Sequence, residues 1–215
     1  MRMWLDELVD LLITNFKNRA ETKRPFIIGL DGLGGAGKTS LAKKLQKEMQ
    51  QFTHVSCFHI DDYILKTKKR YNTGYEEWYE YYYLQWDISY IRQHFLKRLY
   101  DSTEIRLFVY DKLKDEHNLK THKIENDSIV IIEGVFLQRR EWKKYYDYIL
   151  FLDCPWQLKK ERVLDRDLYI GNERDRLTKY ENRYWPAEHH YVKVENPMES
   201  AHTVIFSDRI NDCDS

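Results

Sequence analysis

One short segment limits what this chain can fold into more than any other: residues 32–39 read GLGGAGKT. They fit the pattern G-x-x-x-x-G-K-[ST], whose glycines let backbone N–H groups curl around a phosphate. The pattern works only between a strand and a helix, because the positive end of the helix faces the phosphate. Both are predicted, since FIIGLD at 26–31 is typical of a buried strand and residues 37–51 carry apolar side chains at helical spacing. A glycine-rich turn with a solvated lysine is the alternative, and the two flanking elements disfavour it.

The loop predicts a site for nucleotide phosphates and a metal ion. The ammonium of Lys38 is expected on the β and γ phosphates of ATP, and the hydroxyl of Thr39 is expected to ligate Mg²⁺. ATP and Mg²⁺ are therefore the predicted cofactors. The residues expected to contact the nucleotide are Gly32, Gly34, Gly35, Ala36, Gly37, Lys38, Thr39, Ser40 and, further along the chain, Arg162. A GTP-binding switch protein is disfavoured, because the chain has no N/T-K-x-D motif for reading guanine.

Short apolar runs alternate with helical or loop segments along the chain. This alternation predicts an α/β fold with three layers, in which helices cover both faces of a five-stranded parallel sheet. The strands are expected at 26–31, 55–60, 128–132, 148–152 and 203–206, with a weaker candidate at 105–109. At 215 residues the chain is long enough for one domain with a full core. We expect one domain over 1–215, made of an N-terminal helix at 1–20, an inserted aromatic-rich substrate lobe at 62–104 and an arginine-bearing lid at 159–185.

Composition excludes several classes of protein. The 35 basic residues cancel the 35 acidic ones, so the broad positive surface of a nucleic-acid-binding protein is not expected. No apolar run approaches the length of a membrane span, so no membrane association is expected. The three cysteines are odd in number and far apart, which disfavours a disulfide framework and fits a reducing, cytoplasmic setting. Composition does not decide whether the chain forms a homo-oligomer.

Acidic residues follow two of the predicted strands. Asp61 and Asp62 come directly after 55–60, and Glu133 comes directly after 128–132. The carboxyl ends of parallel strands form the edge at which open α/β sheets bind ligands. Glu133 is therefore a candidate Mg²⁺ ligand, and Asp61 is suited to accept the proton of an attacking hydroxyl. Taken alone, either acid has a plainer interpretation as the cap of a helix or turn.

Arginines are concentrated in the expected lid. In phosphoryl transfer, negative charge gathers on the γ oxygens, and Lys38, Mg²⁺ and mobile arginines offset it. The candidates are Arg162, Arg166, Arg174 and Arg176. We assign catalytic roles to Arg166, Lys38 and Asp61. The alternative interpretation of this charged stretch is an ordinary solvated helix.

Several motifs resemble the uridine kinase and nicotinamide riboside kinase group of P-loop kinases. Residues 26–47 are similar to the group's strand, loop and helix, and HIDDY at 59–63 resembles its D-[DS]-F-[FY] segment. The first Asp of that segment is the catalytic base, which implies this role for Asp61 and a place beside the substrate for Tyr63. LQWD at 84–87 is similar to the L-Q-Y-D of nicotinamide riboside kinases, where the aromatic ring stacks on the base and the Asp holds ribose hydroxyls. The resemblance implies the stacking role for Trp86, which is then expected to be exposed to the cleft, and the ribose-binding role for Asp87.

A second resemblance concerns reading of the base. VYD at 109–111 resembles the P-V-Y-D of uridine kinases, which implies that Tyr110 lies beside the base. The family carries a histidine five residues after this tyrosine that helps to read the pyrimidine edge. In this chain Asp115 stands at that position, and the nearest histidine is His117. Specificity for uridine therefore stays open.

The later motifs follow the family in the same order. IEGV at 132–135 resembles its strand-end E-G, which implies a place near Mg²⁺ for Glu133. RVLDRD at 162–167 is similar to the lid motif R-x-L-R-D with one residue inserted, which implies phosphate and substrate contacts for Arg162 and Arg166.

The resemblance implies an ATP-dependent phosphotransferase that phosphorylates a primary hydroxyl of a small nucleoside-like molecule. The 5′-OH of a ribonucleoside is the first expectation, with nicotinamide riboside and pantothenate as alternatives. A hypothesis from another class is a nucleotide-binding regulatory protein that keeps the loop but has no small-molecule acceptor. The aromatic stretch at 71–90 distinguishes them, because its rings either form the core of a lobe or line a cleft for a planar ring.

Overall fold

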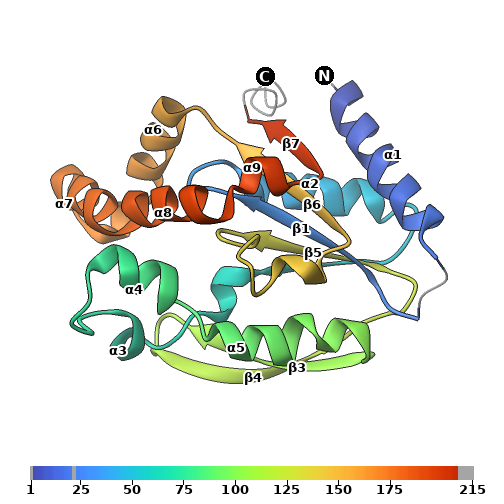
Figure 1. Cartoon of the computed structure of the whole chain (residues 1–215), viewed down its shortest axis with the longest axis horizontal. Coiled ribbons are helices and arrows are strands. Elements are labelled where there is room, and N and C mark those ends of the chain that lie inside the picture. The colour runs from blue at the N-terminus through green and yellow to red at the C-terminus, as the bar shows by residue number, and fades with distance from the viewer. Residues whose placement is uncertain (1, 21–22, 208–215) are drawn as a thin grey trace.

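A five-stranded parallel sheet forms the centre of the protein, in a computed structural model that describes residues 2–20 and 23–207. The strand order across the sheet is β2-β5-β1-β6-β7 (Figure 1). The strands are β1 (Phe26–Gly32), β2 (Val55–His59), β5 (Ile129–Gly134), β6 (Tyr148–Asp153) and β7 (Thr203–Phe206). All five expected strands of the sheet are present, and the three-layer α/β fold is confirmed.

The register of the central strands determines where the site forms. β1 lies between β5 and β6, and every residue of β1 and β5 is buried, as the continuous apolar runs predict. Asp31 of β1 is paired with Gly134 of β5, and His59 of β2 is paired with Glu133. The carboxyl ends of β1, β2 and β5 therefore meet at one edge of the sheet, at the point where the strand order reverses around β1.

Helices cover both faces of the sheet (Figure 1). The helices α1 (Arg2–Asn18) and α2 (Lys38–Met49) bury their apolar stripes against one face, in a cluster that includes Leu12, Leu41 and Leu45. The other face packs against the segment between β2 and β5, the turns after β5, and α8 (Trp185–Glu195). Between β6 and β7 lie α6 (Trp156–Arg166), η5 (Leu168–Ile170), α7 (Glu173–Lys179), η6 (Tyr180–Tyr184), α8 and α9 (Pro197–Ser200).

The segment between β2 and β5 combines helices with a hairpin. Its helical elements are η1 (Ile60–Tyr63), α3 (Thr67–Arg70), α4 (Glu77–Tyr83), α5 (Ile88–Tyr90), η2 (Ile91–Leu96) and η3 (Arg98–Tyr100). The weak strand candidate at 105–109 is real, but it belongs to a separate antiparallel hairpin of β3 (Glu104–Asp111) and β4 (Glu116–Lys123). The sequence analysis did not predict β4, because nearly all of its residues are polar and most are exposed, so no apolar alternation marks it.

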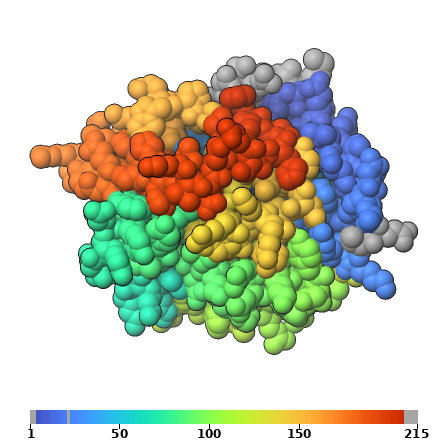
Figure 2. Space-filling view, viewed as in Figure 1, coloured from blue at the N-terminus to red at the C-terminus, as the bar shows by residue number. Residues whose placement is uncertain are grey.

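The segments on either side of the sheet edge touch each other. α4 contacts both η6 and α8. Figure 2 shows the same closeness on the surface, where the green inserted segment lies directly against the orange and red segment that contains α7 and α8. In the part of the chain that the structure describes, no helix is both long enough and apolar enough to cross a membrane.

Candidate active site

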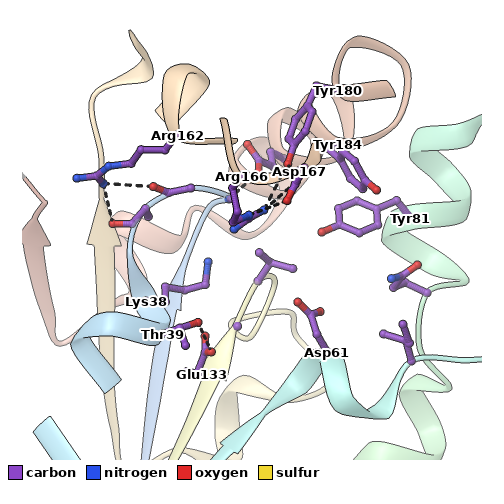
Figure 3. A pocket seen from close by; sticks show the side chains of 18 of the residues that line it. Lys38, Thr39, Asp61, Tyr81, Glu133, Arg162, Arg166, Asp167, Tyr180 and Tyr184 are labelled. Atoms are coloured by element: carbon purple, nitrogen blue, oxygen red, sulfur yellow. Dashed lines mark hydrogen bonds and ion pairs between the residues drawn. The ribbon is translucent and has the colours of Figure 1, made fainter. Parts of the chain in front are cut away.

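A cavity of about 900 Å³ opens at the carboxyl edge of the sheet. Its lining includes loop residues 34–40, Asp61 and Asp62 after β2, Glu133 at the end of β5, and residues of α3, α4 and the segment from α6 to α8. The predicted phosphate loop, the three predicted acidic residues and two of the predicted arginines thus line one space, part of which Figure 3 shows. Gly32 does not line this space, since it lies beneath the loop, where a Cβ would come within 2.6 Å of the Leu152 carbonyl oxygen.

Two glycines give the loop its shape. Gly37 has φ +99° at the start of α2, a left-handed conformation that glycine adopts without steric cost. Gly35 has φ +77°, and a Cβ there would lie 2.7 Å from Val163 Cγ1 and 2.9 Å from the Lys159 carbonyl oxygen. The loop is therefore pressed against α6, and only a residue without a side chain fits at position 35.

The hydroxyl of Thr39 and the carboxylate of Glu133 form a direct contact. Thr39 Oγ1 donates a hydrogen bond of 2.8 Å to Glu133 Oε1, and the same oxygen contacts Nδ1 of His59. Burial alone would raise the pKa of Glu133, but the hydrogen bonds of His59 and Thr39 and the charge of Lys38 hold it below its usual value. The hydrogen bond to Glu133 likewise raises the pKa of His59. Glu133 is therefore an ionised carboxylate beside a hydroxyl, and His59 is a residue of this cluster that the sequence analysis missed.

Lys38 is buried at the start of α2 and reaches back over the loop. Its Nζ donates a hydrogen bond of 2.9 Å to the carbonyl oxygen of Leu33. Burial lowers the pKa of Lys38, while the charges of Glu133, Asp31, Asp61 and Glu188 oppose that shift. The Lys38 ammonium therefore has several carboxylates around it, and a bound phosphate would add to that negative charge.

Asp61 projects into the cavity from the side opposite the phosphate loop (Figure 3). It belongs to η1, which follows β2 directly, so its position depends on the end of that strand. The side chain is exposed to the cavity, but protein on the surrounding walls displaces bulk water from it. This desolvation, together with the charge of Glu133, raises the pKa of Asp61, and the charge of Lys38 opposes the shift. A carboxylate with a raised pKa is a better proton acceptor than an ordinary aspartate.

The site suits a metal ion that is held mainly by phosphate oxygens. Within residues 2–20 and 23–207, no group of three or more His, Cys, Asp or Glu side chains is arranged to hold a metal. The Thr39 hydroxyl and the ionised Glu133 are hard oxygen donors at the edge of the glycine loop. Mg²⁺ usually takes one or two protein ligands and completes its shell with substrate phosphates and water. The donors present therefore fit Mg²⁺ accompanying a nucleotide.

Two of the four candidate arginines face the cavity, and two do not. Arg166 donates hydrogen bonds of 2.7 and 3.0 Å to both carboxylate oxygens of Asp167, which Tyr180 also contacts (Figure 3). Arg162 Nη1 donates to the loop carbonyl oxygens of Gly35 and Ala36, at 3.3 and 3.5 Å. The two remaining candidates, Arg174 and Arg176, do not line the cavity.

The structure corrects the expectation for Trp86. This side chain is 2% exposed, and its Nε1 donates a hydrogen bond of 2.9 Å to the carbonyl oxygen of Ile60. It packs edge-on against Phe136 and Trp142 in the main core. Trp86 is therefore a core residue that supports η1 from behind, and it offers no face to a ligand.

The structure places Asp87 and Tyr63 outside the cavity lining in which they were expected, while Tyr110 does line the cavity. Asp87 lies outside the cavity lining and caps α5, where its Oδ1 accepts a hydrogen bond of 2.8 Å from the amide of Tyr90. Tyr63 is buried with its ring 5.3 Å from that of Phe95. The Tyr110 hydroxyl donates to Asp115 Oδ1 at 2.9 Å.

Tyrosines form the other wall of the cavity, and apart from Tyr110 the sequence analysis did not single them out. Tyr81 of α4 and Tyr184 of η6 meet edge-to-face, with ring centroids 4.8 Å apart. Figure 3 shows Tyr81 projecting toward the space above Asp61. The tyrosines in the lining are Tyr71, Tyr81, Tyr110, Tyr169, Tyr180 and Tyr184. The only sequence signal for Tyr81 was its membership of the aromatic stretch, which could not separate wall residues from core residues.

Comparison with known proteins finds one matching family and several similar kinases. The family model described as "Phosphoribulokinase / Uridine kinase family" matches residues 27–214. A structure from Bacillus stearothermophilus described as a possible uridine kinase is 35% identical, with a TM-score of 0.78 over 95% of this chain and 98% of that one. The uridine kinase of Lactobacillus johnsonii is 26% identical over 155 residues, 68% of this chain and 70% of the relative. The uridine kinase of Streptococcus agalactiae is 25% identical over 181 residues, 80% of this chain and 82% of the relative.

Proposed function

The chain belongs to the phosphoribulokinase and uridine kinase family, and we propose that it is an ATP-dependent kinase acting on a primary hydroxyl of a small molecule, the 5′-OH of a ribonucleoside first among them. One observation carries the proposal: Lys38, the Thr39–Glu133 pair and Asp61 converge on a single cavity. This is the set of groups that transfer of a phosphoryl group to an alcohol requires.

Asp61 is assigned as the general base. Its carboxylate lies across the cavity from the phosphate loop, so an acceptor hydroxyl between them would be in reach of both the carboxylate and the phosphate. The raised pKa of Asp61 suits it to take the hydroxyl proton as the oxygen attacks. The proton ends on Asp61 Oδ, and the new bond joins the acceptor oxygen to phosphorus while the bond to the β-phosphate oxygen breaks.

Positive groups around the loop offset the charge of the transferring phosphoryl group. Lys38 holds an ammonium beside the loop amides, and Arg166 holds a guanidinium at the cavity wall. Asp167 orients that guanidinium through two hydrogen bonds. When bound with ATP, Mg²⁺ would be held by Thr39 and Glu133 together with phosphate oxygens, and it would supply further neutralisation of phosphate charge.

Tyrosines in the cavity wall support a planar acceptor. Burial of Trp86 removes the side chain on which the nucleoside assignment first rested. The edge-to-face pair of Tyr81 and Tyr184 offers aromatic surface in the cavity instead, and Tyr110 is a further ring beside it. The same walls disfavour a purely regulatory nucleotide-binding protein, because the cavity extends well beyond the phosphate loop.

A coupled assay of ADP release tests the proposal. The purified protein is incubated with ATP, Mg²⁺ and, one at a time, uridine, cytidine, adenosine, nicotinamide riboside and pantothenate. We expect acceptor-dependent ADP release with at least one nucleoside, and phosphate on its 5′ oxygen by NMR. Folded protein that binds ATP but releases no ADP above background with any acceptor would contradict the kinase assignment. ADP release with pantothenate alone would support the kinase assignment but show that the acceptor is pantothenate and not a nucleoside.

A further inference from the structure

A buried carboxylate of α8 touches the predicted phosphate loop. Glu188 Oε1 accepts a hydrogen bond of 2.7 Å from the amide N–H of Gly34, and its other oxygen accepts one of 2.8 Å from Nζ of Lys159. The side chains of Glu188 and Lys159 are almost fully buried, at 4% and 6% exposure. A Cβ at position 34 would lie 2.9 Å from Glu188 Oε1, so the close approach depends on glycine in the loop.

This contact unites three distant parts of the chain. Glu188 lies on α8, Lys159 lies on α6, and Gly34 precedes α2, so the pair joins two separate helices to the loop. One turn after Glu188, the hydroxyl of Tyr191 donates a hydrogen bond of 2.5 Å to Asp31 Oδ2 at the base of the loop. α8 therefore holds the loop at two points, one at its base and one at the amide of Gly34.

The charge of Glu188 needs a partner at this position. Its charge acts on Lys38, the residue expected to meet the β and γ phosphates, so an isolated carboxylate here would repel a triphosphate. Lys159 cancels that charge at 2.8 Å. With the pair intact, the carboxylate can hold the Gly34 amide without opposing the binding of phosphate.

We propose that Glu188 and Lys159 act together as positioning residues for the phosphate loop: Glu188 fixes the Gly34 amide, and Lys159 makes this carboxylate compatible with bound polyphosphate. The inference rests on the proposed use of ATP, but it concerns nucleotide binding and makes no assumption about the acceptor. It assigns neither residue a contact with the reacting atoms.

A charge cycle tests the role of Lys159. Binding of AMP, ADP and ATP is measured by calorimetry for the wild type, Lys159→Met, Glu188→Gln and the double variant. Lys159→Met leaves a buried, unpaired carboxylate, so ATP affinity should fall about tenfold and AMP affinity much less. In the double variant Glu188→Gln removes the carboxylate charge, and ATP affinity should return to within about threefold of the wild type. A merely structural role would not make the loss depend on the number of phosphates.

A second comparison tests the hydrogen bond to Gly34. Glu188→Gln keeps an oxygen that can accept from the amide, so ATP should bind within about threefold of the wild type, whereas Glu188→Ala should bind about tenfold more weakly. Glu161→Gln, which removes an exposed charge from α6, serves as the matched control and should change affinity less than twofold. Thermal unfolding without nucleotide checks that each variant is folded. The comparison of Glu188→Gln with Glu188→Ala does not use Lys159→Met, so it tests the proposal even where that variant does not fold.

The outcomes separate this inference from the proposed function. Equal ATP affinity in wild type, Glu188→Ala and Lys159→Met would overturn the positioning pair and leave the kinase proposal intact. Tighter ATP binding by Glu188→Ala would also overturn it, because it would show the carboxylate competing with phosphate. A wild-type protein that binds no nucleotide would overturn both.

Discussion

The hydroxyl of Thr39 donates a hydrogen bond of 2.8 Å to Oε1 of Glu133. The two residues are 94 positions apart in sequence, and the contact joins the first turn of α2 to the carboxyl end of β5. Their oxygens are thus set side by side at the loop by the parallel pairing of β1 with β5.

This pair predicts how Mg²⁺ dependence responds to substitution. Thr39→Ala removes one hard oxygen donor, so we expect the Mg²⁺ concentration for half-maximal activity to rise about tenfold or more. Thr39→Ser keeps a hydroxyl and is the matched control, with an expected change of less than about threefold. Activity is measured against Mg²⁺ at saturating ATP. Equal Mg²⁺ dependence for Ala and Ser would contradict a metal role for Thr39.

Tyr81 is expected to act on the acceptor and not on ATP. Tyr81→Ala removes one ring of the edge-to-face pair with Tyr184, so the KM for the acceptor should rise about tenfold while the KM for ATP stays nearly constant. Tyr81→Phe retains the ring and should resemble the wild type. Initial rates with each substrate varied in turn distinguish the two effects. An unchanged acceptor KM in Tyr81→Ala would contradict a contact between Tyr81 and the acceptor.

Trp86 is expected to behave as a core residue. Trp86→Ala empties a large buried volume and should lower the free energy of unfolding by about 3–5 kcal/mol, measured by urea denaturation. Asp87→Ala removes the cap of α5 and should cost about 1 kcal/mol, with an unchanged KM for the acceptor. A large rise in acceptor KM for Asp87→Ala, in a variant of near-normal stability, would show that Asp87 contacts the acceptor after all.

Local patterns in the sequence were enough to predict the sheet and the edge at which the cavity opens. The glycine pattern located the loop, and the rule that ligands bind at strand ends located Asp61 and Glu133, because each directly follows a predicted strand. These features depend on neighbours in sequence. The same logic found all five strands of the sheet, and burial makes the three central strands, β1, β5 and β6, apolar throughout or nearly so.

The tyrosine wall of the cavity, which is expected to contact the acceptor, could not be predicted in this way. Trp86 and Tyr81 lie five residues apart in one aromatic stretch, yet Trp86 is buried behind η1 and Tyr81 lines the cavity. Which ring faces inward depends on how α4 packs against η6 and α8, and these segments are about a hundred residues away in sequence. The contact of Glu188 with Gly34 has the same origin, because a single acid on an amphipathic helix carries no sign of its partner.

The pKa of Asp61 predicts the pH dependence of turnover. Desolvation and the charge of Glu133 raise this pKa above the ordinary aspartate value of about 3.9, and only the ionised form accepts a proton. kcat/KM should therefore fall as the pH decreases through the raised pKa and level off above it. A rate that increases toward acid pH would contradict the assignment.

The raised pKa of Asp61 also affects stability. With rising pH this contribution to stability decreases, whereas turnover increases. A carboxyl group whose pKa is higher in the folded state binds its proton more tightly there, so its contribution to stability declines as the pH rises through that pKa. Asp61→Asn cannot ionise, and the variant should lose this decline and be at least as stable as the wild type near neutral pH. Urea denaturation at several pH values measures the difference. A variant less stable than the wild type at neutral pH would show that the Asp61 carboxylate contributes net stability.

Single turnover by Asp61→Asn is the most direct test of the central claim that a carboxylate facing the phosphate loop drives transfer to an acceptor hydroxyl. Asp62→Asn, the adjacent acid, is the matched comparison, and both are measured by rapid quench with ATP affinity determined in parallel. The account predicts that Asp61→Asn binds ATP within about threefold of the wild type but transfers phosphate at least about a hundredfold more slowly, whereas Asp62→Asn loses less than about tenfold. Normal transfer by Asp61→Asn would contradict it.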